Sequence, residues 1–395
     1  MPSILVGGDV CPTGPNEPLF RAGRADAIFN DLLPEFERAD FRVVNLECPL
    51  VAENHPIRKV GGPVLRAARD CVSGLVAAGI DAVGLANNHI MDQGEAGLRS
   101  TIEVCVGAGI GCFGAGPNLA AAGRILVREV GGLRVGFYGI ADSWFGSVAG
   151  ADRWGANPRD TVEVARSLRR ELPGLDFLVV LLHAGSEHYP YPSPGLRRFC
   201  RFLAEAGAGA VICQHSHCAG SYEHHEGVPI VYGQGNLVFS SPTTRATWHE
   251  GFLVRLNISG AHECSAEWVP HCQSPGEPGV RRMAAAREKE FRAELARRSR
   301  EMEANGFVER EWTGYCRQKK RDFENDLFHP YRSRLLRVLS RRLPSFGKWL
   351  RPNRSRLMLR YYVQCETHRE VLLTMLADET DTPRSGGAEV EAECD

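Results

Sequence analysis

Short apolar runs alternate with helical patterns along residues 1–278. Runs rich in β-branched residues, apolar on both faces, predict strands at 3–10, 41–46 and 81–86. Apolar positions three or four residues apart predict helices at 24–38, 66–78 and 95–108. Because strands buried on both faces are typical of a sheet covered by helices, this pattern predicts an α/β fold.

The second half of this region contains more strands. Two apolar runs, 124–130 and 133–140, are separated by Gly131 and Gly132 and predict a β-hairpin. Helical patterns predict helices at 158–172 and 196–206. Further apolar runs predict strands at 176–182, 210–213, 228–232, 251–258 and 264–269. Together these elements predict an α/β sandwich of mixed sheets, flanked by helices, that ends near residue 278.

The pattern of apolar and charged residues changes after about residue 281. Long charged helical stretches replace the strands, and Pro344 and Pro352 interrupt them. The last residues are acidic and poor in large apolar side chains, which is typical of disorder. We therefore expect three parts: the sandwich domain at 1–278, a helical, Arg-rich C-terminal extension at 279–377, and a disordered acidic tail at 378–395.

Composition places the chain among ordinary globular proteins. It has 395 residues, 43% hydrophobic and 24% charged, with a net charge of −1, so no nucleic-acid partner is expected. The 13 cysteines form no Cys-x-x-Cys pair, which argues against a disulfide scaffold. No apolar run reaches the length of a membrane span, and the first residues do not resemble a signal peptide. The cytoplasm is the expected location.

One segment departs from this balance. Every charged side chain between residues 331 and 365 is basic, and leucines are interleaved with them. Such a segment is often a solvated helix face. It is also suited to weak contact with a membrane or a polyanion, so the inner face of the membrane is a second expected location.

Polar side chains gather at the C-terminal ends of the predicted strands. One or more of them follows each of five strands: Asp9, Glu47, Asn88, His89, His183, His215 and His217. In open α/β sheets this edge is where ligands bind. Each residue has a simpler reading alone: Asp9 as a turn residue, Asp92 as a helix cap, His183 as a buried histidine. Five such coincidences favour a shared site.

The residue types suit a pair of metals. Carboxylate, imidazole and amide ligands fit Mn, Fe or Zn better than metals that prefer thiolates. His215 and His217 are two residues apart, so in an extended segment their rings project to the same side. One ring can then serve each metal, and Glu47 is the candidate carboxylate between them. We therefore expect two divalent transition metal ions.

Several segments together resemble the CapA family, which is linked to poly-γ-glutamate capsule synthesis: GGDV, NLECPL, LANNHIMDQG, HAGSEHY, QHSH and VPIVYGQGNLVF. That family lies within the calcineurin-like metallophosphoesterases, and the resemblance covers roughly residues 3–270. It implies a metallophosphoesterase-type sandwich. It also implies metal ligands at Asp9, Glu47, Asn88, His183, His215 and His217. His89 matches the catalytic histidine, and Asp92 is expected to orient His89 and raise its pKa.

The sequence also departs from this pattern. The wider superfamily begins with Asp-x-His, whereas Cys11 stands in the place of the histidine. Cys11 is therefore either a thiolate ligand or a buried thiol, and one metal can have fewer protein ligands. Asn45 and Glu187 are further candidates for metal ligands or for residues that support them.

These observations predict a metal-dependent hydrolase with a dinuclear site. The favoured activity is phosphoesterase, on an anionic small molecule or polymer, in or near surface-polymer metabolism. One alternative is a hydrolase of poly-γ-glutamate or another amide. The other is a non-catalytic, metal-stabilised accessory protein of capsule polymer synthesis, which Cys11 modestly favours.

Overall fold

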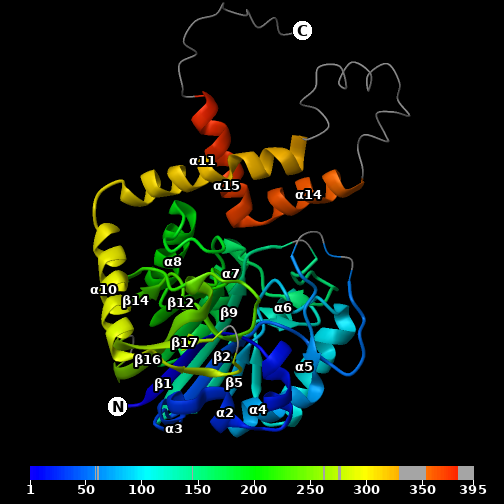
Figure 1. Ribbon diagram of the computed structural model, residues 1–395, viewed down its shortest axis with the longest axis vertical. Coiled ribbons are helices and arrows are strands. Elements are labelled where there is room, and N and C mark those ends of the chain that lie inside the picture. The colour runs from blue at the N-terminus through cyan, green and yellow to red at the C-terminus, as the bar shows by residue number, and fades with distance from the viewer. Residues whose placement is uncertain are drawn as a thin grey trace, which may run out of the picture.

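The computed structural model describes residues 1–57, 59, 62–144, 146–260, 263–274, 277–328 and 353–380. Two β-sheets pack face to face in the middle of the molecule, helices cover their outer faces, and further helices gather at one end (Figure 1). The predicted α/β sandwich with a C-terminal helical part is therefore confirmed.

The first sheet combines a parallel half with an antiparallel half. Its strand order is β18-β17-β16-β1-β2-β5-β6, and β15 pairs in parallel with the end of β1. Strands β1, β2, β5 and β6 are mutually parallel, whereas β16, β17 and β18 are antiparallel. The bounds are β1 Ser3–Cys11, β2 Phe41–Leu46, β5 Ala82–Gly84, β6 Gly111–Phe113, β15 Asn236–Phe239, β16 Glu250–Gly260, β17 Glu263–Gln273 and β18 Val280–Arg282.

The second sheet has the order β13-β14-β12-β11-β9-β8. Its central strands β9, β11, β12 and β14 are parallel, and the predicted hairpin is formed by β8 and β9. The bounds are β8 Leu126–Val130, β9 Leu133–Ala141, β11 Phe177–His183, β12 Ala210–Gln214, β13 Tyr222–His225 and β14 Val228–Val231. Two small pairs, β3 (Leu50–Val51) with β4 (Ala67–Ala68) and β7 (Ala115–Gly116) with β10 (Gly155–Ala156), lie outside these sheets.

Successive side chains along a strand point to opposite faces of the sheet, so each strand contributes to two apolar layers. Ile4 and Val6 of β1 point into the core between the two sheets, while Leu5 points to the helices on the outer face. From the second sheet, Phe137 and Leu181 fill the same central core. Replacing a buried phenylalanine such as Phe137 with alanine typically costs about 3–5 kcal/mol.

Helices cover both outer faces and one end of the sandwich. On the first sheet lie α1 Glu17–Arg21, α2 Ala25–Phe29, α3 Leu33–Glu37, α4 Val72–Ala77 and α5 Gly94–Gly107. On the second sheet lie α7 Thr161–Glu171, capped by the Asp160 side chain, and α8 Pro194–Glu205, capped by Ser193. Short helices α6 (Leu119–Ala122) and α9 (Ala246–His249) lie in connections.

Three expectations about elements were wrong. The helix expected at 24–38 is divided, because Asn30 has a φ of 46° and a new helix, α3, begins at Leu33 with Pro34 in its first turn. The helix expected at 66–78 begins only at Val72. The first sheet extends past residue 278, since β18 pairs with β17 and the next helix, α10 (Ala285–Glu301), contributes Phe291 to the central core.

The C-terminal helices form a group of their own. Helices α11 (Phe307–Phe328), α14 (Asn353–Gln364) and α15 (Glu366–Thr380) pack around Trp312, Tyr362 and Val371 and lie at one end of the sandwich (Figure 1). Of the basic segment at 331–365 that is expected to contact a membrane, residues 331–352 lie outside the described residues, as do residues 381–395 of the acidic tail. Among the helices that the structure describes, none combines the length and apolarity needed to cross a membrane.

Candidate metal centre

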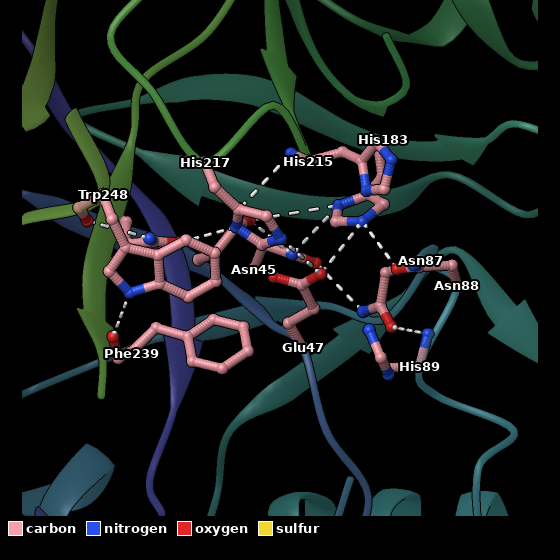
Figure 2. Close-up of polar contacts among 12 residues, drawn as sticks. Asn45, Glu47, Asn87, Asn88, His89, His183, His215, His217, Phe239 and Trp248 are labelled. Atoms are coloured by element: carbon pink, nitrogen blue, oxygen red, sulfur yellow. Dashed lines mark hydrogen bonds and ion pairs between the residues drawn. The ribbon is translucent and has the colours of Figure 1, made fainter. Parts of the chain in front are cut away.

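The predicted site residues meet where the parallel strands of both sheets end. Asp9 belongs to β1, Glu47 directly follows β2, and Asn88 lies beyond β5 in the first sheet. His183 is the last residue of β11, and His215 directly follows β12 in the second sheet. Because the two sheets face each other, side chains from these ends converge between them (Figure 2). The structure thus brings together residues that are up to 208 positions apart, from Asp9 to His217.

Two glycines aim Asp9 into this space. The pairing of β1 with β2 shifts register between Val6 and Asp9, which is the signature of a bulge. A Cβ atom on Gly8 would lie 2.2 Å from the carbonyl oxygen of Gly235, so only glycine lets the segment before β15 approach this closely. The sequence GGD therefore encodes both the bulge and the direction of the carboxylate.

Glu47 lies at the centre of the group. Its side chain is fully buried, and neither carboxylate oxygen has a hydrogen-bond partner among the residues that the structure describes. Oε1 lies 3.3 Å from Nε2 of His183 and 4.0 Å from Nε2 of His217. Burial, together with the nearby carboxylate of Asp9, raises the pKa of Glu47 well above its usual value. A buried, unpartnered carboxylate costs several kcal/mol unless a cation offsets it.

A chain of amides orients His183 and Asp9. The Asn87 amide donates to Oδ1 of Asn45 at 3.1 Å, and the Asn45 amide donates to Oδ1 of Asp9 at 2.8 Å. Asn45 also lies 3.2 Å from Nδ1 of His183, whose Nε2 is 3.0 Å from Oδ1 of Asn88. Burial lowers the pKa of His183 to about 4, so its imidazole is neutral, as a metal ligand must be.

His215 and His217 lie on a strained turn. Their backbone φ angles are 89° and 50°, which residues other than glycine rarely adopt. The backbone N–H of His215 donates to Oδ2 of Asp9 at 3.3 Å, and Nδ1 of His215 is buried without a partner. Nδ1 of His217 lies 2.8 Å from Oδ1 of Asn236, which leaves Nε2 directed towards Glu47. Such a second contact fixes the tautomer of a ligating histidine.

Charge distinguishes these two histidines. Burial lowers the pKa of His215 well below its usual value, and the neighbouring histidines add to this. Burial also acts to lower the pKa of His217, but the carboxylates of Glu47 and Asp9 outweigh it and the pKa is raised. Both imidazoles face acidic oxygen ligands, which is the mixed oxygen and nitrogen donor set that divalent transition metals prefer.

Two groups of ligand atoms result. Glu47, His215 and His217 form one group, and Asp9, Glu47 and His183 form the other; within each group the atoms lie within 4.8 Å of one another. Glu47 belongs to both groups, as a carboxylate between two metals must. The donor types and the oxygens of Glu47, which lack hydrogen-bond donors among the described residues, fit the binding of divalent cations.

His89 lies beside this centre in a network of its own. Its Nδ1 is 2.6 Å from Oδ2 of Asp92, and Nζ of Lys59 lies 2.8 Å from Oδ1 of Asp92 and 3.0 Å from Nδ1 of His89. Asp92 was expected to raise the pKa of His89. It acts in that direction, but burial and the positive charge of Lys59 outweigh it, and the pKa of His89 falls to about 4.

Two further candidates lie apart from the ligand groups. Cys11 is fully buried in the core on the outer side of the first sheet, and its Sγ lies 3.7 Å from the hydroxyl of Thr13. Glu187 is exposed in the loop after β11. Neither belongs to the groups of potential metal ligands among the described residues. Asn45 contacts Asp9 and His183 and therefore supports ligands.

Sequence reasoning missed four residues that shape the centre. Asn236 holds His217, Trp144 lies with its ring centroid 4.6 Å from that of His215, Trp248 lies 4.4 Å from His217, and Lys59 contacts Asp92. Asn236 falls in the segment GQGNLVF, which is part of the resemblance to the CapA family, so the sequence could have indicated a role for it. Lys59 lies in a loop without a periodic pattern, where no local signal could identify it.

Comparison with known proteins identifies relatives. The family model described as bacterial capsule synthesis protein PGA_cap matches residues 3–241. The chain is 27% identical over 260 residues to the capsule biosynthesis protein CapA of Bacillus anthracis, which is 64% of this chain and 63% of that protein. It is 35% identical over 216 residues to a probable polyglutamine synthesis accessory protein of Mycobacterium tuberculosis (strain CDC 1551 / Oshkosh), 50% of this chain and 55% of that protein. The chain thus spans less than two thirds of the length of these relatives.

Solved structures show more distant similarity. A hypothetical protein from Thermus thermophilus is similar with a TM-score of 0.45 and 16% identity, covering 69% of this chain and 100% of the other. A 5′-nucleotidase precursor from the same organism is similar with a TM-score of 0.41 and 16% identity, covering 75% and 58%. The sequence match, and not these structures, carries the assignment of the family.

Proposed function

Because the chain belongs to the bacterial capsule synthesis protein family PGA_cap, we propose that it is a metal-dependent hydrolase that cleaves phosphoesters in or near surface-polymer metabolism. The observation that carries this proposal is Glu47: a fully buried carboxylate without a hydrogen-bond partner, shared by two groups of potential metal ligands. A role in packing does not account for a carboxyl group that is buried here without a hydrogen-bond donor in the part of the chain that the structure describes.

The ligands would hold two divalent cations, which we propose to be Mn, Fe or Zn. Asp9, Glu47 and His183 would hold one cation, and Glu47, His215 and His217 the other, with Asn88 adding an amide oxygen beside His183. When bound, two such cations supply an activated water and offset negative charge on a phosphoryl group. Asn45, Asn87 and Asn236 keep the ligands in position through their hydrogen bonds.

His89 would act on the substrate with Asp92 and Lys59 as positioning residues. Asp92 accepts from Nδ1 of His89 at 2.6 Å, which leaves Nε2 to exchange a proton with the substrate. The imidazole of His89 is neutral near pH 7 because its pKa is about 4. An arriving anion raises the pKa of a nearby histidine, so His89 would then take up a proton and donate it to the leaving oxygen.

A non-catalytic, metal-stabilised accessory role is the second candidate. The exposed fractions of Asp9, Glu47, His183, His215 and His217 are all 5% or less, which suits a structural metal centre as well as a closed catalytic one. One relative is also named as a probable accessory protein of polyglutamine synthesis. A third candidate keeps the centre but has poly-γ-glutamate or another amide as its substrate.

The deciding experiment combines metal content with turnover. Protein purified without chelator should contain about two equivalents of transition metal and should hydrolyse a bis-aryl phosphodiester when Mn²⁺ is added. His89→Ala should keep the metals and lose roughly 10²–10⁴-fold in kcat. His224→Ala, at an exposed histidine of β13, is the matched control and should keep both. Full metal content without hydrolysis of the phosphodiester or of poly-γ-glutamate would favour the accessory role.

A further inference from the structure

The metal centre approaches solvent at His188. The ring of His188 lies 6.5 Å from that of His217 and 5.9 Å from that of Trp248, and both His188 and Trp248 are partly exposed. His188 has a φ of 62°, and its Nδ1 is buried without a hydrogen-bond partner in the described ranges of the chain. A substrate part that extends from His217 towards solvent on this side therefore passes His188.

Helix α11 of the C-terminal group lies against this loop. The ring of Tyr315 is 4.4 Å from that of Tyr189, the residue after His188, and 5.5 Å from that of Trp312. Nζ of Lys319, one helical turn further, lies 5.7 Å from the centroid of the Tyr315 ring. The family match ends at residue 241, so α11 lies outside the matched region.

Helix α15 joins the C-terminal helices to two segments near the candidate metal centre, at Ser143 and Ser193. The carboxylate of Glu366 accepts hydrogen bonds from the backbone N–H and the hydroxyl of Ser143 at 2.6 and 2.9 Å, next to Trp144. Glu370 accepts from the hydroxyl of Ser193 at 2.5 Å. The C-terminal helices are therefore held on both site loops in one position.

The side chains at this place carry an excess of positive charge. Arg245 directly precedes α9, which carries Trp248 beside His188, and Lys319 lies over the ring of Tyr315, so two elements next to this loop each supply a cation. Burial and these two charges lower the pKa of His188, and the carboxylate of Glu187 acts against them. Neither Arg245 nor Lys319 forms an ion pair with a carboxylate among the described residues. Glu187, exposed in the same loop, offsets only one of the two charges.

We propose that His188, Arg245, Tyr315 and Lys319 form a basic rim that binds a second anionic group of the substrate, a carboxylate or a phosphate remote from the bond that is cleaved. This proposal rests on the proposed function for the position of that bond. It extends the site to the C-terminal helices and predicts an elongated substrate with repeated negative charges. A small, singly charged ester would contact only the metal centre.

Equilibrium binding to the metal-loaded full chain tests the rim. Isothermal titration calorimetry would use two probes, a γ-linked glutamate pentapeptide and tripolyphosphate. Both Lys319→Glu and Arg245→Glu should weaken binding of at least one probe about tenfold, because a charged contact is worth roughly 1.4 kcal/mol or more. Metal content should stay at the wild-type value. Lys289→Glu, at an exposed lysine of α10, makes the same change of charge away from the rim and should bind as the wild type does.

The two probes separate the possible sources of the anion. Stronger binding of the peptide would assign the rim to a carboxylate polymer, and stronger binding of tripolyphosphate to a phosphate compound. Wild-type affinity in both charge-reversed variants, or no binding of either probe by the wild type at about 1 mM, would overturn the proposal. Because binding is read without turnover, a protein that binds these probes through the rim but hydrolyses nothing would contradict the proposed function alone.

Discussion

At the scale of single residues, Glu47 indicates a binding site because its buried carboxyl group lacks a hydrogen-bond donor among the described residues. The fold buries this carboxylate completely, and in the described part of the chain no donor forms a hydrogen bond with its oxygens. The nearby amides of Asn45 and Asn87 donate to other acceptors. Removing a charge from water without compensation costs several kcal/mol. Natural proteins retain such a cost where a ligand offsets it, so Glu47 points to a cation.

Replacing Glu47 with glutamine should separate metal binding from folding. Glu47→Gln keeps the volume but removes the charge shared by both ligand groups, so metal content should fall from about two equivalents to one or fewer. The metal-free variant should be at least as stable as the metal-free wild type, because a carboxyl group with a raised pKa costs stability at neutral pH, whether it stays charged or takes up a proton, and glutamine avoids this cost. Elemental analysis and thermal unfolding in chelator measure the two effects.

A matched control is available at an exposed position. Glu205→Gln removes a carboxylate whose side chain is 53% exposed and which pairs only with His225 among the described residues. It should leave metal content unchanged. A Glu47→Gln protein with two tightly bound metals would show that Glu47 is not a ligand.

At the scale of elements, strand β17 carries a second buried polar group with no role in the centre. His271 is fully buried, neither ring nitrogen has a hydrogen-bond partner among the described residues, and burial lowers its pKa to about 3. The unfolded chain binds a proton at this histidine below about pH 6.5, whereas the folded chain does not until about pH 3. The folded state therefore loses stability as pH falls through this window.

Replacing His271 with leucine should remove part of the acid sensitivity. Between pH 8 and pH 5 the free energy of unfolding of the wild type should fall by about 2 kcal/mol more than that of His271→Leu, since each pKa unit corresponds to about 1.4 kcal/mol. At pH 8 the histidine is neutral in both states, so this difference should vanish. Urea unfolding at both pH values measures it, and His224→Leu at an exposed position serves as control. An equal difference at pH 5 and pH 8 would refute the titration of His271 as the cause.

At the scale of the whole molecule, the candidate metals connect the two sheets. Asp9 and Glu47 come from the first sheet, and His183, His215 and His217 come from the second. Each ligand group contains members from both sheets. A cation at either place therefore binds the folded arrangement and not the unfolded chain, in which these residues are far apart.

Removing the metals should lower the stability of the whole sandwich. A cation present at 100 times its Kd stabilises the folded state by about 2.7 kcal/mol. Calorimetry should show a fall in Tm of several degrees after treatment with a chelator and recovery on addition of Mn²⁺ or Zn²⁺. Glu47→Gln should show little of this response. If neither the chelator nor the added metal changes the Tm, the proposal of a metal centre shared by the two sheets is wrong.

Much of the centre could be predicted from the sequence for a simple reason. Parallel strands end at a common edge, so polar residues that follow apolar runs, such as Asp9, Glu47 and His183, must lie near one another once the strands are recognised. The departure at 24–38 shows the limit of local patterns. A continuous helical periodicity is broken there by the backbone of Asn30, whose amide donates to the carbonyl of Val280, 250 residues away.

Local sequence was enough to predict most of the strands, the α/β class and the residues of the candidate metal centre, because these predictions depend on periodicity and on side-chain chemistry. The folded arrangement was needed to show that Glu47 lacks a partner, that Cys11 lies in the core, and that burial and Lys59 outweigh Asp92 in setting the pKa of His89. It also placed α11 beside the loop of His188. These properties depend on neighbours and solvent exposure, which arise only when segments distant in the chain come together.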